Sequence, residues 1–179
     1  INMRTIGISV LIAAIIMIPN FAEANSSLCI DLNRKNWLLE NEKIDGAHTK
    51  TCHIDPKESD LIKRVQSGIE GCKRASVASA FRSQNVAQTV IRSTLVQNTR
   101  NVRAWFRRAK IGQKKSFKHK PRQKRAAGLS VTQKTAETSV KGRSCRNSGY
   151  ICDDVKKVTV VLKKIDANKC FILTAYPSE

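Results

Sequence analysis

The sequence predicts an α+β fold, in which helices of the N-terminal part pack on an antiparallel β-sheet that ends in a C-terminal β-hairpin. Two observations lead to this prediction. Apolar residues recur at helical spacing in three segments between positions 55 and 109, whereas positions 155–176 are rich in β-branched and aromatic residues. Hydrophobic residues make up 41% of the 179, enough for the core of one domain and too little for a polytopic membrane protein.

The first 24 residues have the features of a secretory signal. A 13-residue apolar run, Ile6–Ile18, follows Arg4, and Ala22-Glu23-Ala24 carries small residues at the two positions that signal peptidase reads. The run is shorter than the ~20 apolar residues that a spanning helix needs. We therefore expect residues 1–24 to be removed on export. Residues 25–179 should then form a single secreted domain, extracellular or periplasmic, that is monomeric and has no membrane span.

Three helices are expected ahead of the basic part of the chain. Asp55 is suited to cap the first, Glu58 completes a capping box, and an apolar stripe continues this helix to Gly71. The second is expected over Gln84–Val96, and Thr99 is suited to cap the third. The apolar stripes fit packing against a core, which is the interpretation we adopt.

Two β-rich segments, Val155–Leu162 and Cys170–Tyr176, flank a turn and predict an antiparallel hairpin. Alternation along the second strand puts Thr174 and Tyr176 on one face, together with Ile172. Threonine and tyrosine are common in strands, so this pair of hydroxyls taken alone fits a structural role better than a catalytic one.

All six cysteines follow the signal segment, and thiols delivered to an oxidising compartment are expected to pair. Three structural disulfides are therefore expected, with free or intermolecular thiols as the alternative. A local pair between Cys145 and Cys152 is one reasonable connectivity, since a short glycine-containing loop separates them. No two cysteines have C-x-x-C spacing and the three histidines complete no zinc pattern, so no metal is expected. The six are Cys29, Cys52, Cys72, Cys145, Cys152 and Cys170.

The chain is strongly basic, with 33 Lys and Arg against 14 Asp and Glu and a formal net charge of +19. No acidic residue lies between Glu70 and Glu137, and Arg100–Arg125 holds 12 Lys and Arg together with three aromatic residues. Cations that displace counterions and rings that stack on bases are typical of nucleic-acid binding. A merely solvated face would mix both signs of charge. The residues expected to contact RNA are Arg100, Arg103, Arg107, Arg108, Lys110, Lys114 and Lys115.

Within this stretch, Lys114–Arg125 has no apolar periodicity and contains Pro121, so a mobile basic loop is expected there. Its Arg122-Gln123-Lys124-Arg125 sequence also has the pattern of a processing site or a nuclear-import patch.

Several short fragments occur in a distinctive order: Gly46-Ala47-His48-Thr49, His53-Ile54, Arg64-Val65, Ala80-Phe81, Val102-Arg103-Ala104-Trp105, Val160-Val161-Leu162-Lys163 and Leu173-Thr174-Ala175-Tyr176-Pro177. Their order and spacing resemble the bacterial RNase A-like toxin domain, known from the C-terminal ends of contact-dependent growth inhibition toxins. The resemblance covers about Ile44–Glu179 and implies an RNase A-like fold with a basic insert around 110–143.

In that family the active site combines a His that precedes Val or Ile, an Arg eleven residues later, and the Thr and Tyr of a T-x-Y ending. The matching residues here are His53, Arg64, Thr174 and Tyr176. The resemblance therefore implies an endoribonuclease toxin that needs no metal or other cofactor and leaves a 2′,3′-cyclic phosphate. It also implies a cognate immunity protein, for which an acidic surface suits the +19 charge. The second proton-transfer role is open between His48 and Tyr176.

The chain also departs from the family pattern. Ala47 replaces a family glycine, the basic insert is long, and six cysteines occur in a family that is usually poor in them. Charge and cysteines fit a different class equally well, namely a secreted cationic protein that binds nucleic acid or an anionic membrane and catalyses nothing. The four site residues favour the enzyme, because membrane disruption has no use for two hydroxyls on one strand face.

Overall fold

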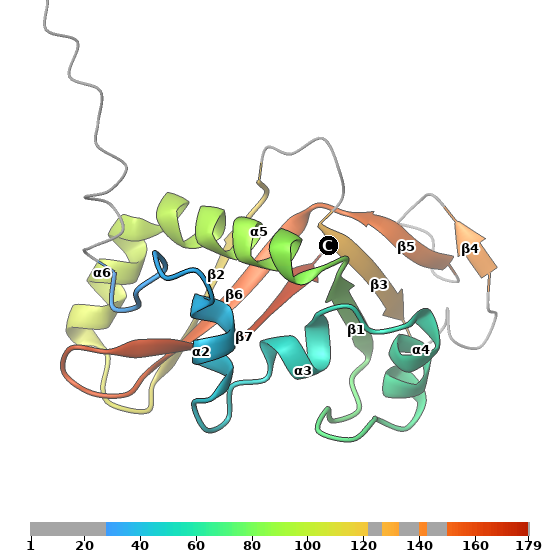
Figure 1. The fold of residues 1–179 in the computed structure, drawn as a ribbon, viewed down its shortest axis with the longest axis horizontal. Helices are drawn as coiled ribbons and strands as arrows, with labels where there is room; N and C mark the ends of the chain where they lie inside the picture. Colours follow the sequence, from blue (N-terminus) through green and yellow to red (C-terminus); the bar gives the residue numbers. More distant parts are fainter. Residues whose placement is uncertain (1–27, 122–126, 133–139, 143–149, 179) are drawn as a thin grey trace, which may run out of the picture.

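The structure, a computed structural model, describes residues 28–121, 127–132, 140–142 and 150–178, and combines helices with two β-sheets (Figure 1). The helices are α2 (Trp37–Glu42), α3 (Thr49–His53), α4 (Glu58–Gln66), α5 (Gln84–Gln97) and α6 (Thr99–Arg108). One sheet has the strand order β1-β3-β5-β4, formed by Val77–Phe81, Gly128–Thr132, Tyr150–Val155 and Val140–Gly142. The other has the order β2-β6-β7, formed by Lys114–His119, Lys157–Lys164 and Cys170–Ser178. The predicted α+β class is confirmed.

The predicted C-terminal hairpin is confirmed, since β6 pairs with β7 in antiparallel fashion. The register shifts between Val161 and Leu162, so β7 holds one extra residue, a β-bulge. Because of the bulge, Ile172 points into the core while Thr174 and Tyr176 face a cleft on the other side. The prediction that Ile172 shares a face with these two hydroxyls is therefore wrong.

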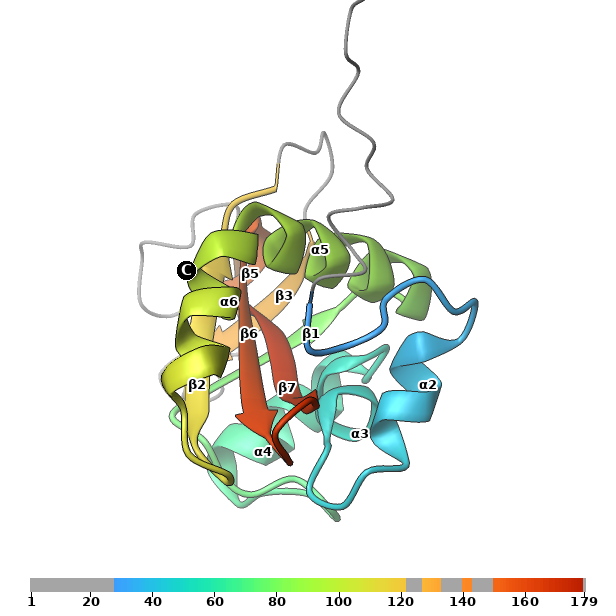
Figure 2. The same cartoon turned by 90° about the vertical axis from the view of Figure 1, so that its left-hand side faces the viewer.

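The main core lies between α5 and the inner face of the β2-β6-β7 sheet (Figures 1 and 2). Val90, Ile91 and Leu95 of α5 and Leu162 of β6 are each at most 1% exposed. Burying such a side chain stabilises the fold by ~2 kcal/mol. Asn41 holds α2 against the free edge of β7, because its side chain exchanges two hydrogen bonds of 2.7 and 2.8 Å with the Ile172 backbone.

The first predicted helix begins later and ends earlier than expected. Asp55 has φ +55° and its N–H donates to Phe81 O, while Ile54 forms a parallel bridge to Phe81. A residue held in the left-handed region at the edge of β1 cannot serve as an N-cap, which needs an extended backbone. The helix therefore starts at Glu58, where the side chain of Asp60 accepts from the Lys57 N–H at 3.1 Å. It stops at Gln66 because Gly68 follows with φ +89°.

The other two helices are confirmed with small shifts. Ser83 caps α5, and its Oγ accepts from the Val86 N–H. Thr99 is the first residue of α6 rather than its cap, since its hydroxyl donates back to Val96 O at 2.7 Å. The far end of α6 is closed by the buried ammonium of Lys164, which donates to Phe106 O and Ala109 O. A cation at this end also interacts favourably with the helix dipole.

The expected mobile loop over Lys114–Arg125 is wrong for its first half. Residues 114–119 form β2, an edge strand that pairs with β6 along its whole length. Phe117 is 4% exposed and anchors this strand in the core. Lysines surround Phe117 in the sequence, so no apolar alternation marks the strand. The Arg122-Gln123-Lys124-Arg125 pattern lies outside the described residues.

Two of the expected disulfides are present. Cys29–Cys170 ties the segment before α2 to the start of β7, and Cys52–Cys72 ties α3 to the turn after α4. The bonded cysteines are 141 and 20 residues apart in the sequence, respectively. The suggested local pair of Cys145 lies outside the described residues.

No helix in the described part of the chain is both long and apolar enough to cross a bilayer. The expected signal segment, residues 1–24, is not part of the described chain.

Candidate active site

A cleft of about 450 Å³ opens where the end of β7 meets β1 and β3, with α3 and α4 at its sides. Residues from both ends of the sequence line it, so that neither end forms it alone. The lining residues are His48, His53, Arg64, Ala75, Ser76, Val77, Ser79, Ser130, Thr174, Tyr176, Pro177 and Ser178. The four residues that the family resemblance implies, His53, Arg64, Thr174 and Tyr176, thus lie in one cleft.

His53 is the last residue of α3 and its side chain is only 6% exposed. Its Nδ1 lies 2.6 Å from Ser79 O. A carbonyl oxygen only accepts, so Nδ1 carries the proton and Nε2 carries the lone pair. The ring of Tyr176 lies beside the imidazole, with 5.4 Å between the centroids and 30° between the planes. His53 is therefore held in one tautomer with its basic nitrogen available to a ligand.

The His53 imidazole is neutral at pH 7. Burial, which disfavours the charged ring, is the main reason that the pKa of His53 is lowered from 6.5 to about 3, and the nearby Arg64 and His48 contribute to the same shift. The hydrogen bond to Ser79 O acts in the opposite direction without reversing the shift. His53 Nε2 can therefore accept a proton but has none to donate.

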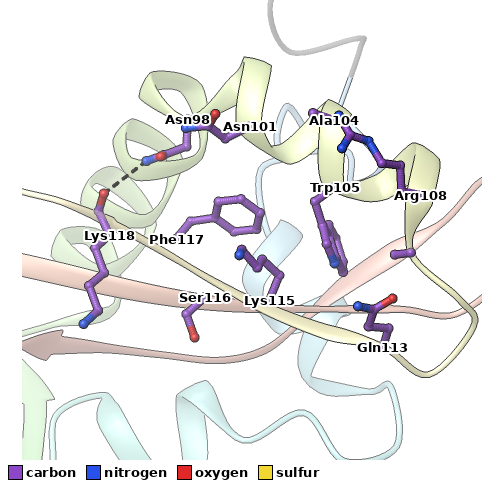
Figure 3. Close-up of a pocket in the computed structure, with 11 residues that line it drawn as sticks. Asn98, Asn101, Ala104, Trp105, Arg108, Gln113, Lys115, Ser116, Phe117 and Lys118 are labelled. Carbon is purple, nitrogen blue, oxygen red and sulfur yellow. Dashed lines mark hydrogen bonds between the residues drawn. The ribbon is translucent and has the colours of Figure 1, made fainter.

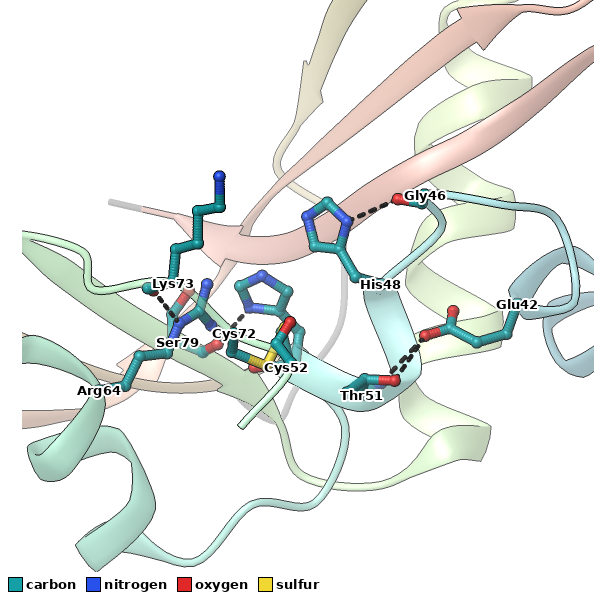
Figure 4. The surroundings of a disulfide bond; sticks show 11 residues. Glu42, Gly46, His48, Thr51, Cys52, Arg64, Cys72, Lys73 and Ser79 are labelled. Carbon is teal, nitrogen blue, oxygen red and sulfur yellow. Dashed lines mark hydrogen bonds between the residues drawn. A yellow bond between two sulfur atoms is a disulfide. The ribbon is translucent and has the colours of Figure 1, made fainter. Parts of the chain in front are cut away.

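Arg64 lies in the second half of α4 and is 8% exposed. Its Nη1 donates to Cys52 O at 2.9 Å and its Nε donates to Lys73 O at 3.4 Å (Figure 4). Burial lowers the pKa of the Arg64 guanidinium from 12.5, and no carboxylate of the described residues pairs with it. A guanidinium stays protonated in proteins, and a buried unpaired charge is costly. The cleft is therefore electrostatically prepared for an anion.

The Cys52–Cys72 disulfide joins the two segments that hold Arg64 (Figure 4). One acceptor of the guanidinium is the carbonyl of Cys52 itself, and the other belongs to Lys73, the residue after Cys72. The disulfide thus keeps His53, which follows Cys52, and Arg64 in a defined relation.

Thr174 and Tyr176 reach the cleft from β7. The Thr174 hydroxyl is fully buried and finds no hydrogen-bond partner among the described residues. Leaving a buried hydroxyl unpaired costs about 1–3 kcal/mol, so this donor is set to bond a ligand rather than to support the fold.

His48, the residue before α3, also lines the cleft. Its Nδ1 lies 2.8 Å from Gly46 O (Figure 4), and its backbone N–H donates to Leu173 O at 3.1 Å. The second bond ties His48 to the bulged part of β7, next to Thr174. Its Nε2 is the ring nitrogen left to serve a ligand.

Ser79 and Ser130 were not expected from the sequence. The Ser79 carbonyl selects the tautomer of His53. The Ser79 hydroxyl donates to Pro177 O at 2.7 Å and so joins β1 to the end of β7. No sequence signal marks these serines, because β1 itself was not expected and backbone carbonyls leave no trace in side-chain patterns.

The seven basic residues expected to contact RNA lie outside this cleft, on α6, β2 and the turn between them. A second hollow of about 500 Å³ separates α6 from β2, and Trp105, Arg108, Lys115 and Phe117 are among its lining residues (Figure 3). Across the described ranges, no group of three or more His, Cys, Asp and Glu side chains gathers to hold a metal ion.

Comparison with known proteins relates this arrangement to one family. No curated protein matches the chain. A chain in the crystal structure of a CdiA-CT/CdiI complex from Y. kristensenii 33638 superimposes with a TM-score of 0.52 at 18% identity, over 71% of this chain and 95% of that chain. This likeness shows a common fold. The family model described as the bacterial CdiA-CT RNAse A domain matches residues 47–177, a range that holds every candidate catalytic residue, and the chain belongs to that family.

Proposed function

We propose that the protein is a secreted toxin that cleaves RNA without a metal ion, by attack of the ribose 2′-OH on the adjacent phosphate. The observation that carries this proposal is the content of the cleft: a neutral imidazole, a buried guanidinium and a buried hydroxyl, where neither the guanidinium has a carboxylate partner nor the hydroxyl a hydrogen-bond partner among the described residues. Transphosphorylation needs a base, a stabilised pentacovalent phosphate and a proton for the leaving oxygen.

In the proposed reaction His53 Nε2 takes the proton of the 2′-OH. The 2′-oxygen then bonds to phosphorus as the bond from phosphorus to the 5′-oxygen breaks. Arg64 and the Thr174 hydroxyl donate hydrogen bonds to the non-bridging oxygens as their charge grows. The products are a 2′,3′-cyclic phosphate and a 5′-hydroxyl. DNA, which has no 2′-OH, would be bound and left uncut.

The leaving 5′-oxygen needs a proton that His53 does not hold. We assign its donation to His48, whose ring lines the same cleft, and assign Tyr176 to holding the His53 ring and hydrogen-bonding the phosphate. Tyr176→Phe keeps the ring and removes the hydroxyl. A loss of rate as large as that of His48→Ala would transfer the acid role to Tyr176.

Substrate binding should also raise the low pKa of His53. The positive charge of Arg64 contributes to the lowered pKa of His53, and a bound phosphate places a negative charge beside both groups. The bound anion should therefore raise the pKa of His53 toward neutrality, where a general base is most effective.

Export and protection follow from the same proposal. A toxic ribonuclease must not act in its producer, and the signal-like residues 1–24 together with the two disulfides fit folding outside the cytoplasm. The structural neighbour is a CdiA-CT/CdiI complex, which supports a cognate immunity protein for this chain as well. An acidic inhibitor would suit the net charge of +19.

The decisive experiment incubates the disulfide-bonded protein with RNA in EDTA and identifies the new ends. Cyclic phosphate and 5′-hydroxyl ends, lost in His53→Ala, are the expected result. Lys35→Ala, an exposed change outside the cleft, is the matched control. RNA that is bound by the protein but stays intact would support the non-enzymatic cationic binder instead. Unchanged cleavage by a folded His53→Ala protein, checked by circular dichroism, would remove His53 from the mechanism.

A further inference from the structure

The sheet face that carries Thr174 and Tyr176 continues across β6 to β2, and Thr159 of β6 is only 1% exposed on it. Tyr176 is paired with Thr159 of β6, and Thr159 is paired with Lys118 of β2. Directly paired residues project from the same face of a sheet. Neighbouring strands are about 4.8 Å apart, so the Cα of Lys118 lies roughly 10 Å from that of Tyr176.

A second row runs parallel to the first. Thr174 is paired with Val161, and Val161 is paired with Ser116 of β2. Val161 is half-buried and Ser116 is exposed. This row therefore places the half-buried apolar side chain of Val161 between the buried hydroxyl of Thr174 and the exposed hydroxyl of Ser116.

A third row lies further from the cleft, where Lys114 is paired with Lys163. The ammonium of Lys163 lies 5.9 Å from the ring centroid of Phe171, its neighbour on β7. Lys114 is exposed, so two cations stand side by side at this end of the face.

The opposite face of the same sheet is occupied. Phe117, Val160 and Ala175 project into the core beneath α5. Figure 3 shows Phe117 and Lys115 directed toward α6, while Ser116 and Lys118 point the other way. The two sides of β2 thus differ: one belongs to the hollow beneath α6, and the other continues the active-site face.

The charge of the β2-β6-β7 sheet is of one sign. Its three strands contain six lysines and no Asp or Glu. Four of these lysines project from the active-site face by the same register, namely Lys114, Lys118, Lys157 and Lys163. A row of cations on strands that contain no acidic residue, next to the proposed phosphate site, favours a ligand with further phosphates.

We infer that this face, with Lys118 and Lys114 on β2, Ser116 between them and Val161 on β6, is the binding surface for the single strand of RNA that continues from the scissile phosphate. The inference rests on the proposed function and extends it to a substrate of several nucleotides. The RNA strand crosses the sheet from β7 to β2. Val161 of β6 contacts a sugar or base on the way, and the lysines of β2 bind flanking phosphates. The hollow beneath α6, which the sequence favoured through Lys115, is not on this path.

The test compares a dinucleoside phosphate, which has only the scissile phosphate, with an oligonucleotide of about eight residues. Lys118→Glu should lower kcat/KM for the oligonucleotide at least ten-fold more than for the dinucleotide, mainly through KM. Lys118→Ala should reduce the salt slope of oligonucleotide binding by about one. Lys35→Glu makes the same charge change outside the sheet. It should change kcat/KM by the same factor for both substrates.

Lys115→Glu gives the sharpest comparison, since it changes a neighbouring residue on the opposite face of β2. A larger oligonucleotide-specific loss in Lys115→Glu than in Lys118→Glu would overturn the inference and move the strand beneath α6. Equal effects of Lys118→Glu and Lys35→Glu on kcat/KM for the oligonucleotide would also overturn the inference. In that case the proposed function would still hold, provided that His53→Ala abolishes cleavage. Failure of the unaltered protein to cleave any RNA would end both.

Discussion

Acidification should destabilise this protein through His53. Burial, Arg64 and His48 lower the pKa of His53 to about 3 in the folded state, whereas an unfolded chain has the ordinary 6.5. Above pH 6.5 the ring is neutral in both states and contributes no pH dependence. As the pH falls below 6.5, His53 becomes protonated in the unfolded chain but stays neutral in the folded protein. Stability is therefore lost progressively until the pH reaches about 3.

The size of the effect follows from the interval between the two pKa values. Each pH unit is worth about 1.4 kcal/mol, so the descent from pH 6.5 to pH 4 costs about 3 kcal/mol of unfolding free energy. This is a large share of the 5–15 kcal/mol or so that stabilises a typical domain.

Urea unfolding at pH 7 and pH 4, followed by circular dichroism with the disulfides intact, measures this cost. His53→Gln is the matched variant, because its amide can donate to Ser79 O and gains no proton over this range. All other ionisable groups are common to the two proteins and cancel in the comparison. The unaltered protein should lose about 3 kcal/mol more than the variant between the two pH values. Equal losses would refute a buried, neutral His53 and with it the proposed base.

Three further changes test other parts of the structure. Thr174→Val removes a hydroxyl without a partner among the described residues, so stability in urea should rise by about 1 kcal/mol while RNA cleavage falls about 100-fold; a stability loss would show that the hydroxyl supports the fold. Replacing Cys52 and Cys72 by Ala opens a loop with a separation of 20 residues, which should cost about 3 kcal/mol in urea unfolding. The same double variant should cleave RNA more slowly at a stability-matched temperature, because it loosens the acceptors of Arg64; full activity there would contradict that role. Gly128→Ala should unfold the protein or lower its melting temperature by more than 10 °C, since an added Cβ would overlap a backbone carbonyl of β1, and a normal melting curve would show that β1 and β3 lie further apart.

The sequence by itself determined the features that local patterns encode. Apolar spacing located α5 and α6, and β-branched residues on either side of a turn located the β6–β7 hairpin. The short fragments from Gly46 to Pro177 identified the family, which the match over residues 47–177 confirms. Each of these signals is carried by residues close together or by motifs in a set order.

Tertiary contacts decided the rest. The start of α4 depends on Asp55 pairing with β1, and β2 forms because Phe117 enters the core beneath α5. The disulfides join partners up to 141 residues apart, a choice that spacing cannot make. The tautomer of His53 comes from a carbonyl of β1, and its low pKa comes from burial and from Arg64 of α4. Periodicity and capping report only on near neighbours, whereas burial, edge pairing and electrostatic fields arise from segments that meet only in the folded chain.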